Sequence, residues 1–333
     1  MGERTRALGL HSGGLDGELA GRLLAEAGVE VEFVHFRSGF EREDRLTALA
    51  RRAAAGGAPF RSIDIGAEFF DDVVLAPRLG RGAGMDACLD CRILMLRRAV
   101  EIAKEERFDL LFTGEVLGQR PRDQSRAALA RTADLAGATD LLVRPLSACK
   151  LPPSPPEARG LIERRVLCGL HGRGRRGQLE LAARLGVEAY PTPSGGCCKL
   201  ADRGFARRLR DLLEHGTQIR PREVEIRRLD LGRHFRLAWN VKLVVGRNEE
   251  ESAWLDRHLG TGARVQVSDG RGALAWMDGE PDRSSLELAG RVAVRYSRHR
   301  GRRRTRVIAA IGDERREWET EPATESLLAR LRV

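Results

Sequence analysis

The sequence predicts an α/β protein with a parallel sheet covered by helices on both faces, followed by a small α+β domain. In the first third, short apolar runs typical of strands alternate with segments of helical periodicity, and glycine-rich motifs follow the strands directly. From about residue 219 the segments become shorter and richer in strand patterns. A chain of 333 residues can form two domains with separate cores. We therefore predict one domain over residues 1–218 and a second over 219–333.

The first domain is predicted to begin with a strand, a turn, a helix and a second strand. Residues 7–10 are apolar and end in a turn, and leucines recur at helical spacing from Leu15 to Leu23. Residues 29–36 alternate apolar and polar side chains, as a half-buried strand does. The rest of this domain is expected to contain a helix just after Cys91, strands at 109–113 and 141–143, a proline-rich connector at 151–156, a basic loop at 172–177, helices at 178–185 and from Phe205 to Leu213, and a turn at 191–196.

The second domain is predicted from the same patterns. Strands are expected at 241–245, 264–267, 292–296 and 306–310, with a basic run at 300–306. A helix should carry Glu249, Glu250 and Glu251 in its first turn, where the helix dipole favours negative charge.

Composition limits the partners and the location of the protein. No apolar run approaches the roughly 18 residues of a membrane helix, and the N-terminus has no signal-peptide pattern, so a cytoplasmic protein is expected. The formal charge of +10 suggests an anionic partner such as RNA. Because only four of the 58 basic residues are lysines, the charge could equally reflect an arginine-rich composition without a binding face.

The turn at Ser12-Gly13-Gly14-Leu15-Asp16 lies between the first strand and the first helix. Glycines let the backbone approach phosphate oxygens, and a helix N-terminus offers N–H donors and partial positive charge. Asp16 has the wrong sign to bind phosphate directly, so a bridging Mg²⁺ is its simplest role. The alternative is an ordinary helix entry, and the pattern is neither a Walker loop nor GxGxxG.

A second polar motif follows the apolar strand at 109–113. Thr113-Gly114-Glu115-Val116-Leu117-Gly118-Gln119 is joined five residues later by Gln124. Hydroxyl, carboxylate and amide groups at a strand end can bind a ligand, or they can simply cap a loop.

These two motifs resemble those of the PP-loop ATP pyrophosphatases, and in particular the tRNA thiouridine synthetase branch. The first is similar to the SGGxDS loop, except that Gly17 replaces the last serine, and the second is similar to TG(D/E)xLGQ…Q. The stretch that ends at Phe36 and the stretches at 144–147 and 190–197 also resemble that branch. Residues 232–237 and 245–250 are similar to the RNA-binding module of NFACT proteins.

The resemblance implies an ATP-dependent tRNA sulfurtransferase that adenylates a uridine carbonyl and replaces its oxygen with sulfur, with 4-thiouridine favoured over 2-thiouridine. It implies ATP and Mg²⁺ as cofactors, and tRNA and a sulfur donor (sulfide or a persulfide carrier) as partners, and it leaves a homodimer open. Two alternatives stay open, a PP-loop ligase acting on a small molecule and a non-catalytic RNA-binding protein. The residues expected to bind ATP are Ser12, Gly13, Gly14, Leu15, Asp16, Phe36, Thr113, Gly114, Glu115, Gln119 and Gln124, with Asp16 also catalytic. His11 and His35 are expected to make local hydrogen bonds only.

Three cysteines are the candidates for sulfur chemistry. Cys88 and Cys91 open a helix, a position expected to lower the thiol pKa, and Cys197 follows a pair of glycines. The three could bind zinc, although Cys198 is a poor fourth ligand beside Cys197, or two of them could act as a persulfide and disulfide pair. The family resemblance implies that Cys88, Cys91 and Cys197 hold a [4Fe–4S] cluster. Cys149 and Cys168 are expected to be structural, and Cys198 has no assigned role.

Overall fold

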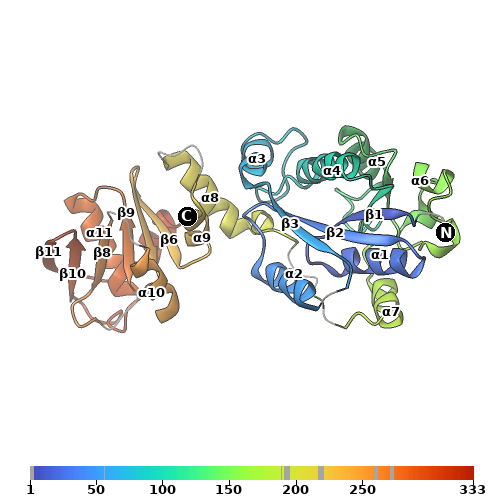
Figure 1. The fold of residues 1–333 in the computed structure, drawn as a ribbon. Coiled ribbons are helices and arrows are strands. Elements are labelled where there is room, and N and C mark those ends of the chain that lie inside the picture. The colour runs from blue at the N-terminus through green and yellow to red at the C-terminus, as the bar shows by residue number, and fades with distance from the viewer. Residues whose placement is uncertain are drawn as a thin grey trace. The chain divides into compact units, whose positions relative to one another are not determined.

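The computed structural model describes residues 4–55, 57–188, 190, 196–216, 221–258, 262–270 and 274–333. The chain divides into two compact units, Met1–Asp202 and Arg203–Val333 (Figure 1). The division falls before helix α8 (Arg203–His215), whereas the sequence placed the boundary after residue 218. Helix α8 is grouped with the second unit, in which its Asp211 forms ion pairs with Arg236 and Lys242.

The first unit is built on a five-stranded sheet in the order β3-β2-β1-β4-β5, and every neighbouring pair of strands is parallel. The chain moves outward from β1 to β3 and then returns to the other side of β1 for β4. The strand order therefore reverses between β1 and β4, and such a switch point leaves a crevice at the carboxyl ends of the strands. The strands are β1 (Arg6–Leu10), β2 (Glu30–Arg37), β3 (Phe60–Asp64), β4 (Leu110–Thr113) and β5 (Leu142–Val143).

Helices cover both faces of this sheet, as the sequence predicted. Figure 1 shows α4 and α5 on one face and α1, α2 and α7 on the other. Helix α1 packs Leu15, Leu19 and Leu24 into a core shared with Phe33 and Phe112 of the strands. The helices are α1 (Leu15–Glu26), α2 (Glu43–Ala55), α3 (Gly66–Phe69), a π-helix (Phe70–Leu75), α4 (Cys88–Glu105), α5 (Arg126–Leu135), α6 (Pro155–Ala158) and α7 (Arg176–Arg184), with 3₁₀ turns at Ala148–Lys150, Arg164–Val166 and Lys199–Ala201.

The strands and helices predicted for the first unit are confirmed to within a few residues. The proline-rich connector is not wholly extended, because Ser154 and Glu157 form a capping box at the start of α6. The turn predicted at 191–196 lies outside the described residues except for Gly196.

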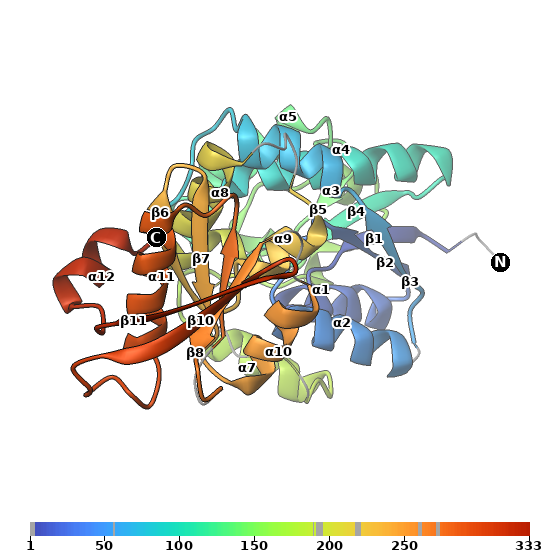
Figure 2. The same cartoon turned by 90° about the vertical axis from the view of Figure 1, so that its left-hand side faces the viewer.

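The second unit is an antiparallel six-stranded sheet in the order β11-β10-β8-β9-β7-β6. Helices α11 and α12 pack against it and bury Leu286, Ala289 and Leu328 with the strand side chains, and Figure 2 shows α11 beside the paired strands β10 and β11. The strands are β6 (Arg233–Ala238), β7 (Val241–Val245), β8 (Ala263–Val267), β9 (Ala275–Asp278), β10 (Thr305–Ile311) and β11 (Glu314–Thr320), and the helices after α8 are α9 (Glu223–Arg228), α10 (Glu249–Arg257), α11 (Arg283–Arg295) and α12 (Glu325–Leu331).

One predicted strand of the second unit is wrong. Residues 292–296 form the last turn of α11 and the residue after it, because Leu286, Ala289, Val292 and Ala293 share one buried helical face. The predicted strands at 241–245, 264–267 and 306–310 are confirmed, as is the helix that begins at Glu249. Among the described residues of both units, no helix is long and apolar enough to cross a membrane.

Candidate functional site

A cavity of about 270 Å³ lies at the carboxyl ends of β1, β2 and β4, where the strand order reverses. Two residues of the predicted loop do not reach its surface. Gly13 contributes only backbone to the turn, and the Leu15 side chain is buried in the core. The other predicted site residues all line the cavity, namely Ser12, Gly14, Asp16, Phe36, Cys88, Cys91, Thr113, Gly114, Glu115, Gln119, Gln124 and Cys197.

The loop at 12–16 presents the N-terminus of α1 to this cavity. Gly14 is the residue before the helix, and no side chain caps the N–H groups of the first turn. Gly13 has a φ of +73°, and a β-carbon there would lie 2.7 Å from the carbonyl oxygen of Arg45. The loop therefore needs glycine for its conformation and offers unpaired backbone donors to an anion.

Asp16 and Gln119 join the two motifs that the sequence singled out. Gln119 Nε2 donates a hydrogen bond of 3.0 Å to Asp16 Oδ2, while Oδ1 of Asp16 is buried and has no hydrogen-bond partner in the described part of the chain. Burial raises the pKa of Asp16, and the Gln119 hydrogen bond opposes that shift. Gly114 allows this approach, because a β-carbon there would lie 2.3 Å from the Asp16 carbonyl carbon. The free oxygen of a carboxylate facing a cavity fits a Mg²⁺ ligand.

Gly17, where the related families carry serine, lies against His11. A β-carbon at Gly17 would be 2.6 Å from His11 Nδ1. His11 is buried, and its ring packs 5.2 Å from the ring of Phe33. The carbonyl oxygen of His11 lies 3.1 Å from His35 Nδ1, so the geometry agrees with the local hydrogen bond predicted for His35.

Glu115 forms the centre of an ion-pair network. Its Oε2 accepts hydrogen bonds from Thr113 Oγ1 at 3.0 Å and Arg144 Nε at 2.8 Å, and its Oε1 pairs with Arg92 Nε at 2.5 Å. Burial raises the pKa of Glu115, but Arg92 and Arg144 outweigh burial and hold it below its usual value. The carboxylate is thus fully engaged by protein groups, and its role in this structure is to fix the end of β4.

Gln124 also positions backbone. Its Oε1 accepts from the N–H of Arg120 at 3.1 Å, and its carbonyl oxygen accepts from the N–H of Gly118 at 2.7 Å. The segment 118–124 is therefore closed on itself, and this closure places Gln119 next to Asp16.

The cysteines reach the same cavity from two directions. Cys88 and Cys91 lie in the first turn of α4, and Cys197 and Cys198 lie in a segment held by the pairing of Cys198 with Glu41 and by Met85 N donating to Leu200 O at 2.8 Å. Thiols far apart in the sequence therefore line one cavity.

The expected effect of the helix position on the thiols is wrong. Burial raises the pKa of Cys88 to about 12 and that of Cys91 well above its usual value. Cys197 differs, since a hydrogen bond from the Cys198 thiol and the positive charges of Arg120 and Arg45 lower its pKa to about 6. Cys197 is therefore the thiol of this cavity whose ionisation its surroundings favour.

The three predicted cluster ligands are of the kind that holds an iron–sulfur cluster, and they line one cavity. Within the described ranges, no three Cys, His, Asp or Glu side chains converge on a single metal ion. A cluster attaches each thiolate to a different iron, so its ligands need only surround a common space. Cys88, Cys91 and Cys197 line such a space, whereas Cys149 and Cys168 do not.

Sequence analysis missed three arginines of the cavity. Arg45 donates a hydrogen bond of 3.4 Å from Nη1 to the carbonyl oxygen of Gly13, and Arg120 follows Gln119 directly. Arg92, one residue after Cys91, pairs with Glu115. Arg45 lies on α2, a helix that the patterns did not predict, so no sequence signal placed it at the site.

The fold and the cavity define a nucleotide-binding α/β domain of the PP-loop class, joined to a separate antiparallel-sheet domain. Residues 2–146 match the family model described as thiamine biosynthesis protein (ThiI), and residues 232–330 match that of the NFACT protein RNA binding domain. The N-terminal region is thus similar to the ThiI family, and the C-terminal region is similar to the NFACT RNA-binding domain.

Among curated proteins, none is significantly similar to the chain in sequence. A 4-thiouridine synthetase in complex with RNA and ATP matches at 22% identity and a TM-score of 0.35, over 55% of this chain and 52% of that one. The U34-tRNA thiolase NcsA of Methanococcus maripaludis, solved with its [4Fe-4S] cluster, matches at 18% identity and a TM-score of 0.34, over 69% and 72%. The C-terminal part of a fibronectin/fibrinogen-binding protein from Streptococcus suis matches at 13% identity and a TM-score of 0.29, over 74% and 90%.

Proposed function

We propose that this protein is an ATP-dependent tRNA sulfurtransferase that adenylates a uridine carbonyl and replaces its oxygen with sulfur. One observation carries the proposal: the loop suited to phosphate and the thiols suited to sulfur chemistry line the same cavity. The ThiI match of the first region and the NFACT RNA-binding match of the second support it.

The charged groups around the loop at 12–16 suggest how ATP would bind. The phosphates of ATP would lie on the loop at 12–16, with the N-terminus of α1 directed at them. Asp16 would hold Mg²⁺ through its free oxygen, and Arg45 and Arg120 would neutralise the charge that develops on pyrophosphate. Gln119 would keep the Asp16 carboxylate oriented during this step.

The reaction balances in two displacements. The uridine carbonyl oxygen attacks the α-phosphorus of ATP, and pyrophosphate leaves. A sulfur nucleophile then adds to the activated carbon, and AMP departs with the former carbonyl oxygen. With sulfide as the nucleophile no oxidant or reductant is needed. With a cysteine persulfide, a second thiol must release the product by forming a disulfide.

The thiols can serve either route. Cys88, Cys91 and Cys197 would hold a [4Fe–4S] cluster, which supplies an iron that can bind sulfide. Without a cluster, Cys197 would be the nucleophile, because it lines the same cavity as the phosphate loop and its surroundings lower its pKa. Cys198 then acts as the donor that lowers this pKa.

The second unit would bind the tRNA backbone by charge. Its run at 300–306 holds five arginines, and all five are exposed. Binding of this kind weakens steeply as salt is added. We place the protein in the cytoplasm, where its tRNA substrate resides, and leave the sulfur donor and a homodimer as parts of the proposal to be measured.

The test is a turnover assay on protein purified without oxygen. ATP, Mg²⁺, sulfide and unmodified tRNA should yield AMP and pyrophosphate, and nucleoside mass spectrometry should detect thiouridine and distinguish the 4-thio from the 2-thio isomer. Cys197→Ala should abolish thiouridine, while Cys149→Ala, a matched change at an exposed cysteine away from the cavity, should not.

Each alternative predicts a different result of this assay. AMP formation that needs no tRNA would indicate a small-molecule ligase, and RNA binding without AMP formation would indicate a binding protein. Iron and acid-labile sulfide that are present in the wild type and lost in Cys197→Ala would support the cluster, while thiouridine formed by iron-free protein would support the persulfide route.

A further inference from the structure

Trp239 is the most exposed large hydrophobic side chain among the residues that the structure describes. It occupies the turn between β6 and β7, and 73% of it is accessible to solvent. An indole that is largely exposed to water contributes little to the stability of the fold, and exposed apolar groups of this size often mark a binding surface.

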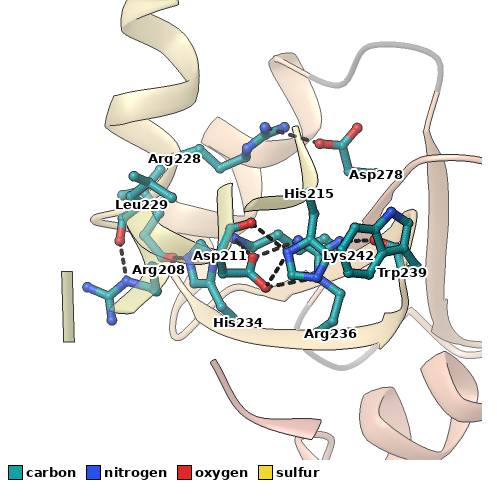
Figure 3. Close-up of polar contacts among 11 residues, drawn as sticks. Arg208, Asp211, His215, Arg228, Leu229, His234, Arg236, Trp239, Lys242 and Asp278 are labelled. Atoms are coloured by element: carbon teal, nitrogen blue, oxygen red, sulfur yellow. Dashed lines mark hydrogen bonds and ion pairs between the residues drawn. The ribbon is translucent and has the colours of Figure 1, made fainter. Parts of the chain in front are cut away.

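The ring is held in place rather than free. The imidazole of His215, on α8, packs against it with ring centroids 4.4 Å apart (Figure 3). Arg236 Nη1 donates to the carbonyl oxygen of Trp239 at 3.3 Å, and the β6–β7 pairing shifts register beside it. Trp239 therefore presents one face to His215 while most of its surface stays open.

A buried carboxylate fixes both neighbours of the indole. Asp211 accepts two hydrogen bonds from Arg236, at 2.9 Å to Oδ1 and 2.6 Å to Oδ2, and a third from Lys242 Nζ at 2.7 Å. The carbonyl oxygen of Asp211 also lies 2.9 Å from His215 Nδ1 (Figure 3). Helix α8 and the hairpin are thus locked together beneath the ring, which preserves its orientation before any ligand arrives.

The cations next to the indole are paired and little exposed. Asp211 engages Arg236 and Lys242, whose side chains are only 19% and 5% exposed, so neither is open to a phosphate. Arg207 is exposed and lies on α8, the helix that also carries His215 and Asp211. An open aromatic face beside a helix with an exposed arginine can hold an unpaired base and its phosphate.

We infer that Trp239, packed on His215 at the tip of the β6–β7 hairpin, is a stacking platform for an unpaired base of the bound RNA. The inference rests on the proposed function, because it assigns a contact within the RNA that the second unit would bind. An exposed tryptophan can also anchor a membrane surface or a protein partner. RNA is favoured because Trp239 lies within the region that matches the NFACT RNA-binding domain.

The test compares variants of the full-length protein with three probes, a short fluorescently labelled oligouridine, an RNA duplex of equal length and an unmodified tRNA. Trp239→Ala should weaken oligouridine binding about tenfold, since stacking on an aromatic side chain contributes that much per base. Trp239→Phe should keep most of the affinity. Leu135→Ala, which removes another exposed apolar side chain, should change nothing.

Salt dependence separates stacking from charge. Trp239→Ala should leave the slope of log affinity against log salt unchanged, because no phosphate contact is lost, whereas Arg207→Gln should reduce it by about one. Duplex binding should be insensitive to Trp239→Ala, since paired bases cannot stack on the indole. The thermal unfolding midpoint of Trp239→Ala should equal that of the wild type, because the ring is largely exposed.

Failure of the inference and of the proposed function give different results. If the wild type binds neither oligouridine nor tRNA, the proposed RNA function fails. If it binds both and Trp239→Ala binds equally well, only the stacking role is overturned. An equal loss of duplex and oligouridine binding in Trp239→Ala, or a change of oligomeric state with unchanged RNA binding, would also overturn it.

Discussion

Gly17 and His11 occupy adjoining space, such that a β-carbon on Gly17 would lie 2.6 Å from the imidazole Nδ1. The packing leaves little room at position 17 for the serine of the SGGxDS pattern. His11 is 6% exposed and packs on Phe33, so it cannot swing away to admit a larger residue. The loss of a hydroxyl at position 17 is therefore coupled to the presence of histidine at the end of β1.

Gly17→Ser should destabilise the first unit by about 1–3 kcal/mol, the usual cost of forcing extra atoms into a packed region. The free energy of unfolding can be measured by circular dichroism in urea. When His11→Ala is added to Gly17→Ser, most of that destabilisation should disappear. The two substitutions should therefore be non-additive in the free energy of unfolding. A Gly17→Ser protein as stable as the wild type would show that His11 is more mobile than the packing indicates.

Asp16→Asn should lower ATP turnover by at least about a hundredfold, which corresponds to the loss of one strong electrostatic contact in a transition state. The change keeps the side-chain shape and the Gln119 contact, so the fold should be unaffected. Turnover is measured as AMP release with tRNA present. Asp134→Asn, an exposed position on α5, provides the control. Normal turnover in Asp16→Asn would remove Asp16 from the proposed metal site.

Gln119→Leu should act on the same carboxylate through its ionisation. Burial already raises the pKa of Asp16, and the Gln119 hydrogen bond lowers it, so removing the amide should raise it further. Only the ionised carboxylate binds Mg²⁺ well. The acidic limb of the turnover profile should therefore move to higher pH, and added Mg²⁺ should partly reverse the shift. An unchanged limb would mean that Asp16 ionisation does not limit turnover.

Glu115→Gln should destabilise the first unit by about 3–5 kcal/mol, because it leaves the buried cations Arg92 and Arg144 without their partner. Glu106→Gln, which breaks a more exposed pair with Arg61, should cost less than about 1 kcal/mol. Folding lowers the pKa of Glu115. Its contribution to the free energy of unfolding is therefore present above the pKa of the unfolded state and is lost as the pH falls through the pKa of the folded state. The difference between wild type and variant should accordingly shrink in acid.

The elements that sequence patterns predicted best are those with unambiguous periodicity. The strand at 7–10, the helix that begins at Leu15 and the alternating strand at 29–36 carry clear patterns, and all three are present. The segment 292–296 fits a strand as well as a helix, because Val292, Val294 and Tyr296 recur at a spacing of two. Its true periodicity is visible only when Leu286 and Ala289 are included.

The predicted site residues were found because glycine and polar groups clustered at strand ends. That logic places Asp16 and Gln119 in one cavity but does not show that they touch, since their contact depends on the closed turn held by Gln124. It also assigns Glu115 to the ligand, whereas Arg92 and Arg144 engage it. Arg92 has no sequence signature, and the resemblance of the stretch 144–147 does not show that Arg144 pairs with Glu115, because both contacts are tertiary.

Asp211→Asn and Lys242→Met should affect the second unit very differently. Removing the carboxylate leaves Arg236 and the buried Lys242 uncompensated, at a cost of about 3–5 kcal/mol. Removing Lys242 leaves Asp211 still paired with Arg236, so an apolar replacement should be nearly neutral. All four tryptophans lie in the second unit, so tryptophan fluorescence during urea unfolding reports on this unit alone.

Stability of the second unit should rise with pH above neutrality, and Lys242 should be the cause. Burial lowers the pKa of Lys242 to about 8, although Asp211 opposes the shift, from an ordinary value of 10.5. Between these values the unfolded chain binds a proton that the folded chain has released, so the free energy of unfolding increases with pH across that window. Below that window Lys242 is protonated in both the folded and the unfolded chain, and the buried charge destabilises the folded state fully. Lys242→Met should abolish the rise, and a wild-type protein with flat stability from pH 8 to 10 would contradict the assignment.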